Sequence, residues 1–303
     1  MERVLITGVS GFSGAGLLEY LREESVYRAQ YFGVSRTPVD VPDGVEGRVC
    51  DLTDSDAVED LLSDVRPTRV FHLSGTFTNE FDADYDGNVL TTRNLLDAAL
   101  SLDKQRCRIL IPGSAAEYGY VRADGEAVSE TCPLQPVSVY GVTKVFQTSL
   151  AQFYARVNGL HVVVARTFNL IGRRISTRLL VGRMYDQILA VQRGDALEIR
   201  LGDISGARDY IDIRDAIRAY VTILERGNSG EVYNVGSGKL TSIRYILRLF
   251  LSQFGMDADV VRTQPGRYRP SDVSTSFCAD TKKLRDLGWS PELTIEGSVR
   301  LFA

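Results

Sequence analysis

Tyr140 and Lys144 are the first residues of the chain whose types and spacing point to chemistry. They stand in the stretch SVYGVTKVFQTSLAQFYARV, which is typical of a helix, and residues four apart share one helix face. A neighbouring ammonium group favours a phenolate and so lowers the pKa of a phenol. The pattern therefore predicts a tyrosine that exchanges a proton with a substrate near neutral pH. Alone, it would also fit two side chains that only pack.

Ser114 is the third candidate catalytic residue. It ends the apolar run of CRILIPGS, which is typical of a buried strand, and open α/β sheets bind their ligands at the carboxyl ends of strands. The alternative is a serine that forms a turn and bonds local backbone. With Tyr140 and Lys144, Ser114 predicts a site in which two hydroxyl groups act on one substrate oxygen.

A glycine-rich turn, TGVSGFSG, runs from Thr7 to Gly14 directly after the first apolar run. Glycines at these spacings allow a tight turn, a close approach of backbone to a pyrophosphate, and a helix packed close to the sheet. The N–H groups at the start of that helix would face the phosphates. The sequence predicts dinucleotide binding rather than a plain turn, through Gly8, Ser10, Gly11, Phe12, Ser13 and Gly14.

The end of the second strand distinguishes between the two nicotinamide cofactors. An acidic residue there would bind the ribose 2′-hydroxyl of NAD, whereas an arginine would accept the 2′-phosphate of NADP. The chain has Ser35 and Arg36 at this point, which favours NADP(H); NAD(H) stays open if Arg36 is only a solvated loop charge. Asp51 and Leu52 follow the third strand, where we expect an adenine contact. Asp54 fits a helix N-cap.

These candidate residues need a scaffold of alternating strands and helices. Short apolar runs at 3–7, 30–35, 46–50, 68–73, 108–112 and 161–165 suit strands buried on both faces, and helical patterns at 14–23, 55–65 and 88–102 separate them. The alternation predicts an α/β fold with a doubly wound parallel sheet. We expect a cofactor-binding Rossmann domain over 1–170 and a smaller α/β substrate lobe over 171–303. The chain is expected to cross back to the first domain around 202–226.

Composition excludes several classes of protein. Of the 303 residues, 44% are hydrophobic and 24% charged, and the net charge of −4 does not favour nucleic acid. The first residues, MERVLITG, lack a basic region followed by a long apolar run, so we expect no signal peptide, and the lack of a sufficiently long apolar stretch leads us to expect no membrane span. The four cysteines form no C-x-x-C pair and only two histidines occur, so no metal site is expected. We expect a cytoplasmic enzyme without membrane or nucleic-acid partners.

Further motifs follow the glycine turn in a fixed order, and with it they resemble the extended short-chain dehydrogenase/reductase family, within its nucleotide-sugar group. Thr91 and Arg173 depart from the usual glycine and proline. The motifs are His72-Leu-Ser-Gly75, Asn88-Val89 with Asn94 to Ala99, Arg166-Thr-Phe-Asn169, Arg208-Asp-Tyr-Ile-Asp-Ile-Arg-Asp215, Tyr233-Asn-Val-Gly-Ser-Gly238 and Arg269-Pro-Ser-Asp272.

The resemblance implies roles for further residues. It places Leu73, Ser74 and Gly75 against the cofactor and makes Ser114, Tyr140 and Lys144 the catalytic set, with Tyr140 and Lys144 also touching the cofactor. It further implies a homodimer joined through the helices at Asn88 and Tyr140. The expected contacts with a nucleoside-diphosphate sugar are Ser114, Glu117, Asn169, Arg183, Arg208, Arg269 and Asp272.

The residues after Ser114 narrow the expected reaction. Ala115 and Ala116 stand where 4,6-dehydratases of this family carry an acid, and fucose-forming epimerase-reductases would have a cysteine in place of Ala116. Two reactions remain: NADPH-dependent reduction of a 4-keto sugar nucleotide, and 4-epimerisation with bound NAD. Segments 113–119, 136–144 and 269–273 are most similar to GDP-4-keto-6-deoxy-D-mannose reductases, which favours reduction to GDP-D-rhamnose. A non-catalytic cofactor sensor is the third hypothesis.

Overall fold

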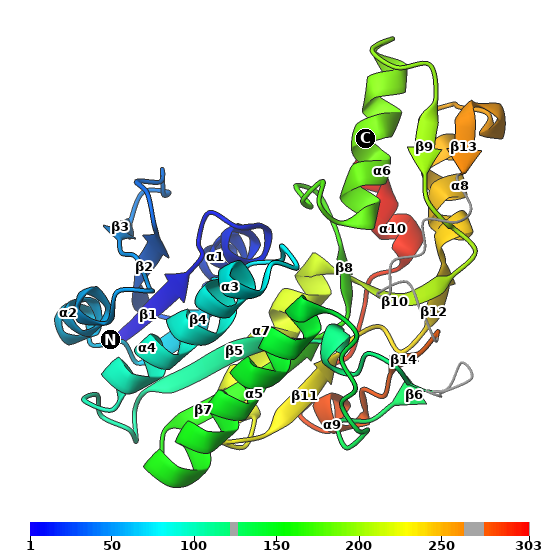
Figure 1. The fold of residues 1–303 in the computed structure, drawn as a ribbon. Helices are drawn as coiled ribbons and strands as arrows, with labels where there is room; N and C mark the ends of the chain where they lie inside the picture. Colours follow the sequence, from blue (N-terminus) through cyan, green and yellow to red (C-terminus); the bar gives the residue numbers. More distant parts are fainter. Residues whose placement is uncertain (122–126, 264–275, 303) are drawn as a thin grey trace.

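The structure, a computed structural model, describes residues 1–121, 127–263 and 276–302. Its largest element is a parallel seven-stranded sheet in the order β11-β7-β5-β4-β1-β2-β3 (Figure 1). The apolar runs of the sequence form these strands because both faces of the sheet are covered. Their bounds are β1 Glu2–Thr7, β2 Ala29–Ser35, β3 Val45–Val49, β4 Arg69–His72, β5 Arg108–Ser114, β7 His161–Thr167 and β11 Val232–Val235.

Helices cover both faces of this sheet, which confirms the doubly wound fold. One hydrophobic core lies under α1 (Phe12–Glu23), α7 (Ile213–Arg226) and α9 (Lys282–Arg285). A second core lies on the opposite face, under α2 (Ser55–Val65), α4 (Thr91–Ala99) and α5 (Val139–Asn158). Short elements connect these layers: α3 Phe81–Asp84, the π-helical turn η1 Tyr85–Leu90, the 3-10 turn η2 Ala115–Glu117, and the paired strands β6 Ala127–Val128 and β14 Cys278–Ala279.

A smaller lobe with its own hydrophobic core follows β7 (Figure 1). It contains a three-stranded sheet of β12 (Leu240–Ser242), β10 (Ala207–Asp212) and β8 (Asn169–Ile171), and a pair of β13 (Val261–Thr263) with β9 (Ile199–Leu201). Since β8 begins two residues after β7 ends, the lobe is joined to the carboxyl ends of the large sheet. Its helices are α6 Leu180–Gln192, α8 Ile243–Gln253, η3 Ala258–Val260 and α10 Ile295–Arg300.

The chain returns from the lobe to the first domain at residues 213–235. In this segment α7 packs on the large sheet and β11 adds its edge strand. The expected return at 202–226 overlaps this segment but ends before β11, because a four-residue strand gives little signal in a sequence. Within the described ranges, no helix combines the length and the apolar character that a membrane span needs.

Candidate active site

The glycine turn between β1 and α1 has the form of a dinucleotide cradle. Gly8 has φ +68°, and a Cβ atom on it would lie 2.8 Å from the backbone nitrogen of Ser74. A Cβ atom on Gly14 would lie 2.2 Å from the Gly8 carbonyl oxygen. No side chain caps the start of α1 at Gly11, which leaves its first N–H groups open to an anion. The residues therefore fit the pyrophosphate of a nicotinamide dinucleotide.

The other residues expected around this turn have different surroundings. Ser10 is exposed and Ser13 is half-buried, whereas Phe12 packs against the cores of both the large domain and the lobe. Ser74 donates its backbone N–H to Thr7 Oγ1 over 3.1 Å, which fixes the end of β4 against the turn. Gly75 leaves room for Asn88, whose Oδ1 would lie 2.9 Å from a Cβ atom at that position. Leu73 to Gly75 thus lie beside the cradle.

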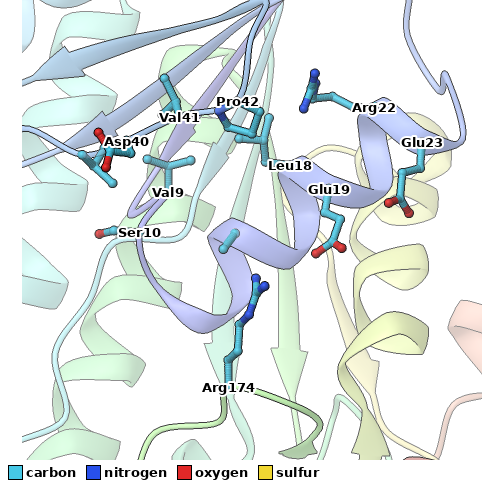
Figure 2. A pocket seen from close by; sticks show the side chains of 12 residues that line it. Val9, Ser10, Leu18, Glu19, Arg22, Glu23, Asp40, Val41, Pro42 and Arg174 are labelled. Atoms are coloured by element: carbon cyan, nitrogen blue, oxygen red, sulfur yellow. The ribbon is translucent and has the colours of Figure 1, made fainter. Parts of the chain in front are cut away.

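A cavity of about 480 Å³ lies beside the glycine turn (Figure 2). Val9 and Ser10 line one end, the outer face of α1 lines a side, and residues 39–42 cover it. Arg174 reaches the cavity from the lobe. Because Ser114, Tyr140 and Lys144 are not among its lining residues, this cavity is not the catalytic site.

The ends of β2 and β3 form the edge where the adenosine ribose is expected. The backbone N–H of Cys50 donates to the Ser35 carbonyl over 3.0 Å, and Ser35 Oγ donates to the Thr37 carbonyl within its own loop. Arg36 is exposed. Hydrogen bonds from Thr53 hold the pKa of Asp51 below its ordinary value, and the charge of Arg36 contributes to this shift.

Local contacts show what two further residues of this edge, Leu52 and Asp54, can do. Leu52 is buried and so offers only its backbone or part of its side chain to a ligand. Asp54 accepts hydrogen bonds from the N–H groups of Asp56 and Ala57, which confirms it as the N-cap of α2.

Ser114 and Tyr140 meet where β5 ends and α5 begins. Ser138 caps α5 by accepting from Gly141 N over 3.0 Å, so Tyr140 stands in the first helical turn. Tyr140 hydrogen bonds with Ser114, and the ring of Phe77 packs edge-on at 4.8 Å between centroids. Ser114 Oγ also accepts from Ala116 N over 3.2 Å. Ser114 therefore forms the local turn and also faces Tyr140, so the two interpretations of this serine are compatible.

The protonation state of Tyr140 differs from the expectation. Burial raises the pKa of Tyr140 to about 12, the hydrogen bond with Ser114 lowers it in part, and the charges of Glu117 and Asp84 raise it further. The expected lowering of this pKa by Lys144 was wrong. The reason is that the lysine ammonium is directed at other acceptors. Tyr140 is therefore a neutral phenol across the physiological range.

Lys144 is buried with its ammonium group against β5. Nζ donates to the Pro112 carbonyl over 2.6 Å and to Oε1 of Gln147. Burial lowers the pKa of Lys144 to about 8, and the charge of Glu117 opposes this shift. Two of its three N–H groups are thus engaged, which leaves one for a ligand.

Glu117 does not have the expected substrate-facing position. Its side chain is fully buried in an ion pair with Arg166 at 2.9 Å. Oε1 accepts from Ser114 N over 2.7 Å and Oε2 accepts from Thr148 Oγ1 over 3.0 Å. The structure therefore corrects the predicted contact with substrate, since both carboxylate oxygens are satisfied inside the protein.

Candidate substrate residues lie in the lobe. Arg208 on β10 is half-buried. The carboxylate of the neighbouring Asp209 accepts from the Ser237 hydroxyl and from the backbone N–H groups of Gly238 and Ala279, so Asp209 does not pair with Arg208. Asn169 is exposed on the adjacent strand and donates to the Asp209 carbonyl over 3.0 Å. Arg183 is exposed on α6. The predicted contacts Arg269 and Asp272 lie outside the described residues.

Asp84, which the sequence did not single out, supports the loop that packs against Tyr140. Asp84 is fully buried and accepts from Thr78 N, Thr78 Oγ1 and Asn79 N at 2.8–2.9 Å. It holds the loop that carries Phe77 against Tyr140. An acid within an exposed-looking run, EFDADYDG, gives no sign in the sequence that it will be buried.

The cradle, the serine at the end of β5 and the tyrosine–lysine helix on a parallel sheet together define an NAD(P)-dependent enzyme of the short-chain dehydrogenase/reductase type. The chain belongs to the NAD dependent epimerase/dehydratase family, whose model matches residues 4–236. The family acts on nucleotide sugars as reductases, epimerases and dehydratases.

Individual relatives cover nearly the whole chain. GDP-6-deoxy-D-mannose reductase of Pseudomonas aeruginosa is 30% identical over 99% of this chain and 95% of its own length. The structure of RMD from Pseudomonas aeruginosa complexed with NADPH is 29% identical, with a TM-score of 0.82 over 100% of this chain and 98% of that chain. UDP-glucose 4-epimerase of Thermus thermophilus complexed with NAD is 27% identical, with a TM-score of 0.86 over 99% and 97%.

Proposed function

We propose that this enzyme uses NADPH to reduce the 4-keto group of a nucleotide-linked 4-keto-6-deoxyhexose, and that the reaction is GDP-4-keto-6-deoxy-D-mannose to GDP-D-rhamnose. The observation that carries the proposal is the Ser114–Tyr140 pair, with Tyr140 protonated and no acid at Ala115 or Ala116. The similarity to a GDP-6-deoxy-D-mannose reductase supports the choice of GDP.

The residues of the site have separate tasks in this reaction. NADPH, when bound, supplies the hydride that reduces carbon 4. Tyr140 donates its phenolic proton to the keto oxygen, which becomes the 4-hydroxyl, and Ser114 donates a hydrogen bond to the same oxygen. The remaining N–H of Lys144 holds the nicotinamide ribose, and its charge favours the phenolate left on Tyr140 until solvent returns a proton.

Substrate binding is assigned to the lobe. The diphosphate needs cationic partners, and Arg208 is available because Asp209 bonds elsewhere. We extend this role to Arg269, and give Asn169, Arg183 and Asp272 contacts with the nucleotide or sugar. Glu117 acts indirectly, by holding the backbone of Ser114.

The preference for NADPH rests on the edge formed by Ser35 and Arg36. Arg36 is exposed beside Asp51, where its guanidinium can donate hydrogen bonds to a 2′-phosphate, which supports NADP(H). Ser35 would have to turn its hydroxyl from the Thr37 carbonyl to add a second bond. NAD(H) remains the alternative cofactor.

The second candidate is an NAD-dependent nucleotide-sugar 4-epimerase, favoured by the high structural similarity to the Thermus enzyme with NAD. Epimerisation must first oxidise the sugar, so it needs Tyr140 as a phenolate base. With its raised pKa, Tyr140 is in the protonated form from which a reduction starts. A cofactor sensor without activity is the weakest hypothesis, since all three catalytic residues are present.

We also propose a homodimer built on the helices that carry Asn88 and Tyr140. Large apolar side chains are exposed along α3, η1 and α5, where burial by a second copy would remove them from water. Phe153→Asp would then give a monomer in light scattering, and a wild type that is itself monomeric would refute the dimer. These side chains are Phe81, Tyr85, Phe146, Phe153 and Val157.

Turnover tests the proposed function. The purified enzyme is incubated with NADPH and, separately, GDP-, UDP- and dTDP-linked 4-keto-6-deoxyhexoses, and loss of reduced nicotinamide is followed. The proposal expects oxidation of NADPH with the GDP sugar above the other two. Absence of oxidation with all three would exclude the reductase, and conversion of a 4-hydroxy sugar nucleotide without added NADPH would establish the epimerase.

A further inference from the structure

Gln147 lies one helical turn after Lys144 and contacts its ammonium group directly. The amide oxygen Oε1 accepts from Lys144 Nζ, whose second protein acceptor is the Pro112 carbonyl at 2.6 Å. Both side chains are buried, at 0% exposure for Gln147 and 4% for Lys144. The direction of the one remaining N–H of the ammonium group is therefore set by these two acceptors.

The amide of Gln147 is itself fixed from the other side. Its Nε2 donates to Thr92 Oγ1 over 2.7 Å, and the Thr92 hydroxyl donates its single proton to the Asn88 carbonyl over 2.7 Å. Because that proton is used, Thr92 Oγ1 can only accept from Gln147. The amide therefore has one orientation that satisfies its neighbours, with Nε2 toward Thr92 and Oε1 toward Lys144.

The same chain of hydrogen bonds continues to the glycine turn. His72 Nε2 lies 3.1 Å from Thr92 Oγ1, and His72 Nδ1 lies 3.0 Å from Thr7 Oγ1, which in turn accepts from Ser74 N over 3.1 Å. Thr92 has no proton left for His72, so Nε2 carries the hydrogen and Nδ1 accepts from Thr7. Buried side chains thus connect Lys144 to the cofactor cradle without a break.

We propose that Gln147 is a positioning residue, which aims the Lys144 ammonium at the cofactor ribose and helps to keep it charged inside the protein. The inference rests on the assignment of Lys144 within the proposed function. Its second part is electrostatic: an amide oxygen beside a buried ammonium stabilises the charged form.

Within the described part of the chain, the other side chains around Lys144 do not contact its ammonium group. Glu117 faces it from η2 and its charge raises the pKa of Lys144, but the carboxylate itself is bound by Arg166. His72 on β4 is neutral because burial and the lysine charge lower its pKa to about 3. Tyr140, on the same helix, is neutral. Asp84, from α3, acts on Tyr140 and is satisfied by its own loop. Gln147 is the side chain that contacts the ammonium group, and a substitution there can either remove the acceptor or give it a negative charge.

The test measures dissociation constants of NADPH and NADH by nicotinamide fluorescence between pH 7 and pH 10. In the wild type, affinity should fall as the pH passes about 8, where the buried lysine loses its charge. Gln147→Leu, which lacks the acceptor, should weaken binding at pH 7 about tenfold and move this midpoint down by about one pH unit. Gln147→Glu places a carboxylate beside the ammonium and should move it up by about one unit.

Gln152→Leu is the matched control, since Gln152 lies on the same helix and, among the residues that the structure describes, bonds only the Gly230 carbonyl, over 3.3 Å. Its midpoint should equal that of the wild type. Equal midpoints in all four proteins, or shifts of the two Gln147 variants in one direction, would overturn the inference. Because binding needs no sugar substrate, loss of the proposed reductase activity would leave this result intact, and the two failures are distinguishable.

Discussion

The Glu117 carboxylate accepts the backbone N–H of Ser114 over 2.7 Å while its other oxygen is paired with Arg166. The register of β5 and β7 creates this arrangement, because it sets Gly113 opposite Arg166. A Cβ atom on Gly113 would lie 2.6 Å from Glu117 Oε1, so the glycine makes room for the acid. The position of Ser114, the proposed catalytic serine, thus depends on a buried ion pair.

The Glu117→Gln variant tests this dependence. It keeps the size of the side chain but leaves the buried Arg166 without a counter-charge, which should lower the free energy of unfolding by about 3–5 kcal/mol. Urea denaturation measures the loss. Glu292→Gln removes a carboxylate that is 65% exposed in an ion pair with Arg218 and should cost about 1 kcal/mol or less. Equal, small losses in both variants would contradict the structural role of Glu117.

Removal of the phenolic hydroxyl tests the proton donor. Tyr140→Phe keeps the ring contact with Phe77 but has no proton to give, so turnover should fall by about 10²–10⁴ while NADPH affinity changes little. Single-turnover kinetics measure the rate of the chemical step, and cofactor titration measures the affinity for NADPH. Tyr154→Phe, on the same helix but bonded to Asp97, should retain its rate. Near wild-type turnover of Tyr140→Phe would show that another group protonates the substrate.

Much of this site could be predicted from the sequence. The glycine turn, the serine at a strand end and the tyrosine–lysine pair were found because local pattern fixes their place: each sits at the end of an apolar run or in the helix that follows one. The strands and helices of the first domain were confirmed for the same reason.

Long-range partners could not be predicted. Glu117 was expected to face substrate, and only the pairing of β5 with β7 brings Arg166 against it. Gln147 carries no local signal, since its partner Thr92 is brought near it by the fold. Asp84 bonds Thr78 only six residues before it, but the sequence does not show that this acid is buried. The protonation of Tyr140 likewise depends on burial, which spacing along a helix does not reveal.

Arg208→Ala tests the substrate lobe. Loss of a charge-assisted bond to the diphosphate should weaken binding of the GDP sugar by about one to two powers of ten, and NADPH affinity should stay constant. Arg200→Ala is the control, because Arg200 is a 71% exposed arginine of the same lobe paired with Glu198. Titration of both ligands on each variant decides the matter. If NADPH and sugar weaken together in Arg208→Ala, the residue supports folding rather than the diphosphate.

Arg36→Ala tests the choice of cofactor. The variant should lose about one to two powers of ten in affinity for NADPH and almost none for NADH, since only the former has a 2′-phosphate. Arg28→Ala removes the same charge just before the opposite end of β2 and should affect neither. A wild type that binds NADH as tightly as NADPH would refute the preference before any variant is made.

Transfer of deuterium from the cofactor to the sugar tests whether this enzyme reduces carbon 4. NADPH that carries deuterium at both positions of carbon 4 of the nicotinamide is supplied with GDP-4-keto-6-deoxy-D-mannose, and the sugar is examined by NMR and mass spectrometry. We expect one deuterium on carbon 4 of the product for each NADPH oxidised, and a strongly reduced yield with Tyr140→Phe. A product without deuterium, or a change at carbon 4 without consumption of NADPH, would contradict this expectation.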